Sequence, residues 1–484
     1  MLFLCCFEQG HPRVSFTLRT PSDPSLSPAF VYVLPSHNVS CTHQAMDTVP
    51  DAKSPPGSMI TNMLAHLKQD RRYAAMLGLG FSIGVPFPLV YATQSAWLSE
   101  AKVPIETIGL LSELTIAYKL KWVWSPFLDR YDPPFFAETL GRRRAWIVVS
   151  QLCIMITLSG VAFGNPAHWL VWTVAFSLAL GISGATQDIC VDGWRITAAP
   201  PGKQSMMTAF SETGFRFGRL AAGAGALLLA DRFGWRFAYL AMAGLIAIGA
   251  LSAFLAPEPE SDKHLTHDHP SFVETIVSPI RDLYQRLGSL ALPILLLVAG
   301  FRMPGYVSDA MSIPLFKSLH YADADIAWVT KVFGFGLALV ATFVSAWLVR
   351  KLGIMRSLLV GTIAGSASHL SLAWLAAHGS SFWDFALAVG IDGFAYAFAQ
   401  MVLITFMSLI VSQDMAASQF ALLTSLCALP GSLLAGTSGF LIKYVGFVNF
   451  FVGTSLLGIP VALLAWYVLR KHGAATWTVQ ADTP

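Results

Sequence analysis

Ionisable side chains inside long apolar segments are the residues of this sequence most able to do chemistry. Asp188, Asp192 and Arg195 follow one another at intervals of four and three residues, so a helix would place them on one face, with Gln187 beside them. Two carboxylates this close repel each other, and one of them then favours a bound proton, which is the chemistry that a proton-coupled carrier needs. The alternative is structural, with Asp192 and Arg195 forming a cap at the helix end.

A second group of charged residues lies on the apolar segment 206–230. Glu212, Arg216 and Arg219 again share one helical face. Three roles remain open for them. Glu212 and Arg216 can form an internal ion pair, Arg216 can bind an anionic substrate through its forked guanidinium, or the group can latch two helices together.

Two lysines lie on the segment 106–127. Lys119 and Lys121 are about 200° apart on a helical wheel, so they cannot both line one cavity. One of them is expected to reach the membrane surface through its long side chain. We assign Lys121, which is nearer the face of Asp129, to a gate, and Lys119, with the adjacent Tyr118, to the substrate site.

Ionisable and polar residues recur at helical spacing in the second half of the chain. Those expected to line a substrate and proton pathway are Asp309, Lys331, Asp392, Tyr396 and Gln400. Arg302 and Tyr306 share a helical face with Asp309. The lone His369 is interpreted as an interior residue with satisfied hydrogen bonds rather than as a proton relay.

Composition decides which kind of protein can hold these residues. The 484 residues are 55% hydrophobic and only 12% charged, about half the charged share of a soluble chain. Such a chain cannot cover a water-facing surface with ions, which excludes a large soluble enzyme. A net charge of +3 is too small to indicate nucleic-acid binding. The six cysteines form no CxxC pair and no cluster, so we expect no disulfide framework, no metal site and no cofactor.

About twelve apolar segments approach the ~20 residues that a membrane-spanning helix needs. They run over 73–97, 106–127, 145–163, 168–190, 206–230, 236–256, 289–314, 325–349, 356–377, 382–410, 417–441 and 447–469. The polar gap 257–288 separates six segments from six. The sequence therefore predicts an all-α polytopic membrane protein, with an N-terminal six-helix bundle (61–256), a linker (257–288), a C-terminal six-helix bundle (289–470) and a tail (471–484). A histidine cluster in the linker, His264, His267 and His269, is interpreted as part of a polar loop rather than as a metal site.

Lysine and arginine are distributed unevenly between the predicted loops. The loops on one side, together with the flanking tails, carry 17 of them near the helix ends, and the opposite loops carry five. Because the cytoplasmic side carries the positive excess, both termini and the linker are predicted to be cytoplasmic. Residues 1–60 are rich in proline and serine and are interpreted as a disordered tail or a mis-assigned start, with Met59 or Met63 as the initiator.

The first apolar segment contains several glycines followed by Pro86 and Pro88. These residues bend or weaken a helix, and the backbone groups that they free are tolerated only beside protein or a cavity. Broken helices of this kind mark binding sites in transporters, so Tyr91 and Gln94 are expected to face the substrate. Close packing through small residues is the alternative explanation.

Two six-helix halves joined by a linker resemble the major facilitator superfamily. Asp129-Arg130 followed by Gly141-Arg142-Arg143-Arg144 resembles its loop 2–3 signature, but Tyr131–Leu140 separates the two parts. That separation is similar to the AmpG-type muropeptide permeases. Further segments similar to that family are Gln94–Leu98, Ile108–Leu110, Tyr118–Arg130, Gly141–Trp146, Ala185–Asp188, Lys331–Gly334 and Ser418–Ser425.

The resemblance implies proton-driven uptake of anhydro-muropeptides (GlcNAc-1,6-anhydroMurNAc and its peptides) across the bacterial inner membrane, by a monomer, for peptidoglycan recycling. Alternating access about a central site is the implied mechanism. The expected cytoplasmic gate comprises Lys121, Asp129, Arg130, Gly141, Arg142, Arg143 and Arg144. The alternative cargoes are a ferric siderophore or an acetyl-coenzyme A-like metabolite. A membrane sensor is a further alternative, and the sequence contains no HExxH motif that would indicate a polytopic enzyme.

Overall fold

The computed structural model describes residues 70–104, 107–108, 111, 113–258, 272–379 and 381–472, and their regular structure is entirely helical. The predicted all-α membrane fold is confirmed for this part of the chain. The predicted N-terminal tail and the histidine cluster of the linker lie outside the described residues. All the described residues belong to one compact unit.

The first membrane segment is one interrupted helix. It consists of α2 (Arg71–Gly84), α3 (Pro86–Val90) and α4 (Ala92–Glu100). The carboxylate of Asp70 accepts the N–H of Arg72 and caps the start of α2. The helix breaks at Pro86 and again at Tyr91, whose φ of −115° and ψ of −97° are not helical. The predicted bend is therefore present, and it follows from the missing N–H groups of the two prolines.

The second segment is built from short pieces rather than from one long helix. They are η1 (Glu113–Thr115), α6 (Ile116–Leu120), η2 (Lys121–Val123) and α7 (Ser125–Arg130). A 3₁₀ turn therefore interrupts the segment at Lys121. The rest of the first half contains α8 (Ala137–Leu140), α9 (Arg142–Phe163), α10 (Leu170–Ala198), η3 (Pro201–Lys203), α11 (Gln204–Leu220), η4 (Ala221–Gly225), α12 (Ala226–Phe233) and α13 (Trp235–Leu255).

The second half begins with a helix in the segment that the sequence assigned to a linker. This helix is α14 (Phe272–Leu287). After it come η6 (Gly288–Leu290), α15 (Ala291–Phe301), α16 (Met303–Ser318), α17 (Asp323–Ala327), η7 (Trp328–Phe333), α18 (Gly334–Leu352), α19 (Ile354–Ala367), α20 (His369–His378), α21 (Phe382–Ile410), α22 (Ala416–Ala435), α23 (Ser438–Leu456) and α24 (Gly458–His472). A turn at Gly446, with φ of +74°, divides α23.

Ten helical stretches in the described part of the chain are long and apolar enough to cross a membrane. The predicted segments 106–127 and 206–230 are not among them. The first is divided into short pieces, and the second carries Glu212, Arg216 and Arg219 on α11. Both departures occur where the sequence places its candidate functional residues.

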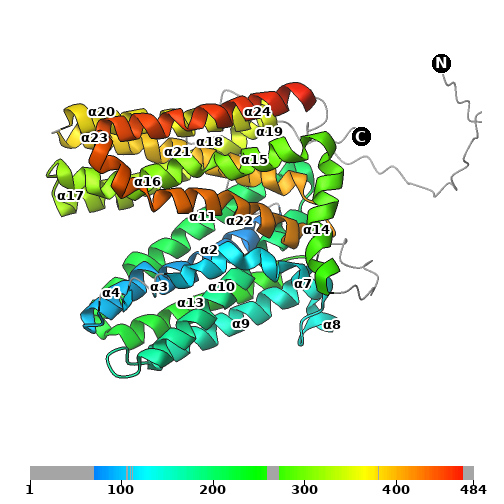
Figure 1. The fold of residues 1–484 in the computed structure, drawn as a ribbon. Helices are drawn as coiled ribbons and strands as arrows, with labels where there is room; N and C mark the ends of the chain where they lie inside the picture. The colour runs from blue at the N-terminus through cyan, green and yellow to red at the C-terminus, as the bar shows by residue number, and fades with distance from the viewer. Residues whose placement is uncertain are drawn as a thin grey trace, which may run out of the picture. The chain divides into compact units, whose positions relative to one another are not determined.

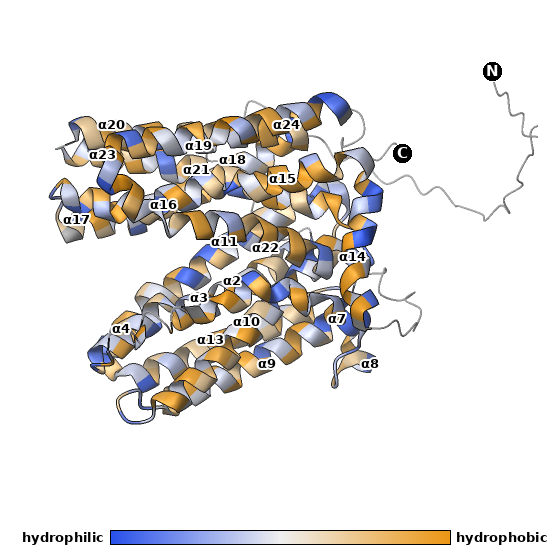
Figure 2. Cartoon of the chain, viewed as in Figure 1, coloured by the Kyte–Doolittle hydropathy of each residue, from blue (hydrophilic) through white to orange (hydrophobic). Residues whose placement is uncertain are grey.

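The apolar cores follow the two halves of the chain. Two clusters gather residues almost entirely from α2 to α13, two others gather residues almost entirely from α14 to α24, and a small one joins Ala209 to Ala346 and Met401. Figure 1 shows the two groups of helices meeting near α14 and diverging toward α4 and α17. In Figure 2, hydrophobic residues predominate along the long helices, whereas hydrophilic residues gather on α14.

A glycine contact holds α2 against α11. Cβ atoms built on Gly80 and Gly84 would overlap the main-chain oxygens of Ser211 and Phe215, and one built on Gly214 would overlap the oxygen of Leu77. The backbones can approach this closely only because the glycines lack side chains. The small-residue packing considered for the first segment is therefore present together with its break.

Candidate functional site

The end of the helices at which α14 lies holds a contact between the two halves of the chain. The carboxylate of Asp129, on α7, accepts the N–H of Ser418 at 2.7 Å and that of Ala417 at 3.4 Å, and it also accepts the hydroxyl of Ser418. These residues begin α22, so Asp129 caps a helix of the other half and faces the positive end of its dipole. Arg143 pairs with the same carboxylate at 3.3 Å, and both side chains are fully buried.

Of the other arginines expected at the gate, Arg144 is bonded within the first half. Arg144 pairs with Glu258 at 2.9 Å, and the buried Arg142 begins α9. Gly141 has a φ of +80°, and a Cβ on it would overlap the Glu258 carboxylate. Arg144 and the close approach at Gly141 therefore tie the start of α9 to the end of the first half.

Arg130 contacts α14 rather than the second bundle. It donates to the hydroxyls of Thr275 at 3.2 Å and Ser278 at 2.6 Å. At the other end of α14, Gln419 of α22 donates to Asp282 at 2.6 Å and accepts from Arg286 at 2.7 Å. The helix α14 is thus bonded to both halves of the chain, as its position in Figure 1 indicates.

Arg195 makes the deepest of these contacts between the halves. Its guanidinium pairs with Asp192 at 3.1 Å and donates to the hydroxyls of Thr208 and Ser408, each at 2.8 Å. It also lies over the ring of Phe420 at 5.0 Å. The residue is completely buried, and it joins α10 and α11 to α21 and α22. The geometry agrees with the structural alternative for Asp192 and Arg195 and extends it across both halves.

Lys121, which the sequence assigned to the gate, pairs with Asp188 on α10, and its ammonium group is buried. Next to this pair, Trp124 donates to Thr186 at 3.1 Å. The hydroxyl of Tyr118 lies close to Gly184. The 3₁₀ turn that starts at Lys121 turns this side chain toward α10, whereas the half-buried Lys119 is not part of the pair.

The amide residues of the predicted site lie inside the first bundle. Gln187 is completely buried and donates to Ser82 at 2.6 Å. Gln94 is buried and donates to Ser177. Of the two residues expected to face the substrate near the break in the first helix, only Tyr91 is exposed, at 47%.

The centre of the described helices brings α11 and α21 together. Gln400 donates to Glu212 at 3.4 Å. The internal pair considered for Glu212 and Arg216 is not formed, since the two do not come within ion-pair distance. The Nε of Arg216 is buried without a hydrogen-bond partner, so this arginine keeps a donor for a ligand.

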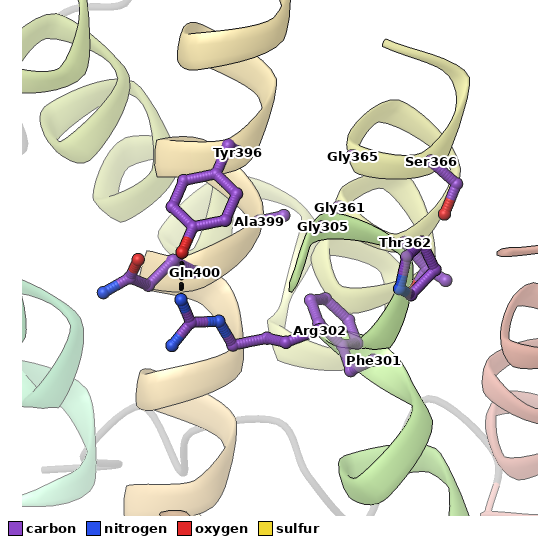
Figure 3. A pocket seen from close by; sticks show the side chains of 11 residues that line it. Phe301, Arg302, Gly305, Gly361, Thr362, Gly365, Ser366, Tyr396, Ala399 and Gln400 are labelled. Carbon is purple, nitrogen blue, oxygen red and sulfur yellow. Dashed lines mark hydrogen bonds between the residues drawn. The ribbon is translucent and has the colours of Figure 1, made fainter. Parts of the chain in front are cut away.

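A pocket in the second half adjoins this centre and has about 350 Å³ of empty space, part of it open to solvent. Figure 3 shows Arg302 and Tyr396 projecting toward each other from α16's start and α21, with Gln400 nearby. The remaining lining comes from α15, α16, α19 and α21: Phe301, Pro304, Gly305, Gly361, Thr362, Gly365, Ser366 and Ala399.

Three titratable residues meet further along α21. Asp392 accepts the hydroxyl of Ser368 at 2.8 Å and lies 4.0 Å from the ring of His369. Asp309 on α16 is near enough to interact electrostatically with Asp392. His369 is buried, as expected of an interior residue, but it faces this carboxylate. Lys331 is exposed on η7.

Sequence reasoning missed the partners that complete the gate: Thr275, Ser278, Glu258, Ser408 and Ser418. They are ordinary hydroxyl and carboxylate residues, and although Ser418 begins a segment similar to the family, nothing in that segment indicates its partner. Glu258 alone had a local signal, since it directly follows the last apolar residues of its helix. The others become visible only when distant helices are brought together.

Charged residues between two groups of membrane helices are typical of transporters for small molecules. The chain belongs to the Major Facilitator Superfamily, whose model matches residues 120–435.

Relatives are similar to the chain over most of its length. The anhydromuropeptide permease of Escherichia coli K12 is 28% identical over 399 residues, which are 82% of this chain and 79% of the permease. The protein of Rickettsia felis named as transporter AmpG 4 is 28% identical over 413 residues, which are 84% of this chain and 99% of that protein.

Solved structures share the fold. The proton:xylose symporter XylE superimposes with a TM-score of 0.61 at 13% identity, covering 82% of this chain and 95% of XylE. The human organic anion transporter MFSD10 gives a TM-score of 0.63 at 14% identity, covering 85% of this chain and 100% of MFSD10. At this level of identity the likeness establishes the fold alone.

Proposed function

We propose that this chain imports anhydro-muropeptides, GlcNAc-1,6-anhydroMurNAc and its peptides, across the bacterial inner membrane for peptidoglycan recycling. The observation that carries the proposal is the similarity to the anhydromuropeptide permease of Escherichia coli K12 over 82% of this chain. Low identity is compatible with a shared cargo because the similarity runs through both halves, which together build the central site.

The chemistry of the centre suits a sugar–peptide. Sugars offer apolar faces that stack on aromatic rings, and muropeptides carry carboxylates. Tyr306 and Tyr396 supply rings, and Arg216 and Arg302 supply guanidinium groups. Glu212 and Gln400 add an acceptor and an amide that can bind hydroxyl or amide groups of the cargo.

The proposed mechanism is alternating access. In this structure the halves are joined at the α14 end through Asp129 and Arg195, and the helices diverge toward α4 and α17 (Figure 1). The excess of Lys and Arg on this side supports a cytoplasmic position of the α14 end, the linker and both termini. The arrangement then corresponds to a carrier closed toward the cytoplasm. Import requires that these contacts break after the cargo has bound, and a single chain contains both halves, so a monomer suffices.

Proton symport is part of the proposal. Asp188 faces Lys121, and a proton on Asp188 would remove the attraction that holds η2 against α10. Protonation and release of this contact would thereby be linked to movement of the loaded carrier. Asp192, Asp309 and Asp392 remain further carboxylates for the proton pathway.

The test is uptake of radiolabelled anhydro-muropeptide into membrane vesicles from a permease-null strain that expresses this chain, with and without an imposed pH gradient. Vesicles without the chain and immunoblotting for its amount are the controls. Accumulation that depends on the gradient supports both cargo and coupling. Accumulation without dependence on the gradient removes proton symport alone. No uptake by correctly inserted protein removes the muropeptide cargo, and a ferric siderophore is then the next cargo to assay.

A further inference from the structure

The structure holds an arginine in an exceptional position inside the membrane. Arg302 lies between α15 and α16, where Pro304 interrupts the helix. The eleven residues of α15 rise about 16 Å, roughly half of a 30 Å hydrocarbon core. Arg302 is therefore near the middle of the membrane, where a guanidinium group is costly and usually functional.

The side chain is held in place but is not neutralised. Its guanidinium lies over the rings of Tyr306 at 4.8 Å and Tyr396 at 5.3 Å, and it donates to the Tyr396 hydroxyl. No carboxylate lies within ion-pair distance of it among the described residues. Glu212 and Asp309 interact with it electrostatically from further away. Its Nε is buried and has no hydrogen-bond partner.

These contacts leave the binding capacity of the guanidinium unused. A cation–π contact offsets only about 0.5–2 kcal/mol, which is less than the penalty for an arginine at the membrane centre. Two aromatic rings also fix the orientation of the planar group, so little side-chain freedom remains to be lost on binding. The free Nε and the pocket of Figure 3 mark where a complementary group fits.

The pocket favours one kind of complementary group. Arg302 is the only cationic residue in its lining, which suits a singly charged group better than a phosphate dianion. A carboxylate matches the fork of a guanidinium through two parallel hydrogen bonds. Part of the pocket is open to solvent, so a carboxylate can reach Arg302 there while the rest of the solute extends out of the pocket.

We propose that Arg302, oriented by Tyr306 and Tyr396, binds a carboxylate of the transported solute in this pocket. The cargo named for the test rests on the proposed function, whereas the carboxylate site follows from the pocket itself. The site makes the carrier selective for acidic solutes over their neutral analogues.

The experiment compares two forms of one disaccharide. GlcNAc-1,6-anhydroMurNAc has a single carboxylate, on its lactyl group, and conversion to the methyl amide leaves a neutral analogue of nearly the same shape. Binding of both to the purified full chain in lipid nanodiscs is measured by calorimetry. Hydrogen bonds to charged groups contribute about 1.5–3 kcal/mol, so the wild-type protein is expected to bind the acid about 10- to 150-fold more tightly than the amide.

Variants separate a binding role from a structural role. Arg302→Gln is expected to remove the preference for the acid while changing affinity for the amide less than about threefold, and Arg302→Lys is expected to retain part of the preference. Arg236→Gln is the matched control, because Arg236 also lies over an aromatic ring, that of Phe163 at 4.4 Å, but is exposed on α13. This variant is expected to keep the wild-type preference. Thermal unfolding checks that each variant is folded.

Four results would overturn the carboxylate site. Equal binding of acid and amide by the wild type removes it and leaves the muropeptide cargo intact. An undiminished preference in Arg302→Gln assigns the carboxylate to another residue. Equal loss of both ligands in folded Arg302→Gln indicates a structural role. Binding of neither form by the wild type removes the cargo and the site together.

Discussion

The cap that Asp129 places on α22 predicts that this one side chain controls which face of the carrier is open. Replacement of Asp129 with Ala removes the acceptor of the Ser418 N–H and hydroxyl. The ion pair with Arg143 lies within the first half, so it can persist in both states of the carrier and does not bias them. Only the hydrogen bonds between the halves therefore contribute to the free-energy difference between the closed and open states.

The magnitude follows from those bonds. Loss of a helix cap costs about 1 kcal/mol, and a hydrogen bond to a charged group contributes about 1.5–3 kcal/mol. Because the exposed donors of α22 regain water in the open state, we expect a net shift of about 2–3 kcal/mol. This corresponds to a change of about 30- to 150-fold in the ratio of open to closed carrier at the α14 end.

The assay is a distance measurement between two spin labels at that end. Cysteines replacing the exposed Glu138 on α8 and Lys351 on α18 carry the labels, in a background from which the native cysteines have been removed. In the wild type the short distance should dominate, whereas in Asp129→Ala a longer distance should become a major population. Asp231→Ala, at an exposed site on α12, is the control. An unchanged distance distribution in Asp129→Ala would show that this cap does not hold the halves together.

Three further changes test neighbouring features. Gly193→Val places side-chain atoms against α22, where even a Cβ would lie 2.9 Å from the Cβ of Ala417. Uptake should fall at least tenfold, and the two spin labels should lie further apart. Normal uptake would contradict the close approach of the helices. Asp188→Asn removes the partner of Lys121; gradient-driven uptake should be lost while exchange persists in vesicles, and equal loss of both would refute a coupling role. Gly141→Ala forces a side chain into a φ of +80° and against Glu258. The free energy of unfolding should fall by about 1–3 kcal/mol, so the midpoint of thermal unfolding should also fall. An unchanged midpoint would refute the strain.

Hydrophobic patterning was enough to predict ten of the twelve spans, but not the division of the segments 106–127 and 206–230, and it gave some of the helix faces. Tyr396 and Gln400, four residues apart, do line one pocket. Periodicity failed at Lys121 for a specific reason. A helical wheel assumes 100° per residue, but the 3₁₀ turn over Lys121–Val123 winds by about 120° per residue. The side chain is therefore rotated from the position that a regular helix gives it, and it reaches Asp188.

Contacts between the halves were beyond prediction from one sequence. Asp129 and Ser418 are 289 residues apart, and neither residue type indicates the other. Their meeting depends on how two groups of helices pack, which local propensity and spacing do not encode. Arg302 illustrates the same limit, since its charge was visible in the sequence but the two rings that orient it come from different helices.

Polar side chains attach the two ends of α14 to different halves of the chain, and the two attachments differ in strength. Arg130 is held by two hydroxyls rather than by a carboxylate. Each of these two bonds from a charged donor contributes about 1.5–3 kcal/mol, and water can replace the hydroxyls when this end of the helix detaches. The opposite end makes four hydrogen bonds with the second half, through Gln419 and Arg286, and is the stronger attachment by number. During the cycle α14 should therefore stay attached to the second half and move with it, while its contacts with Arg130 of the first half break and re-form.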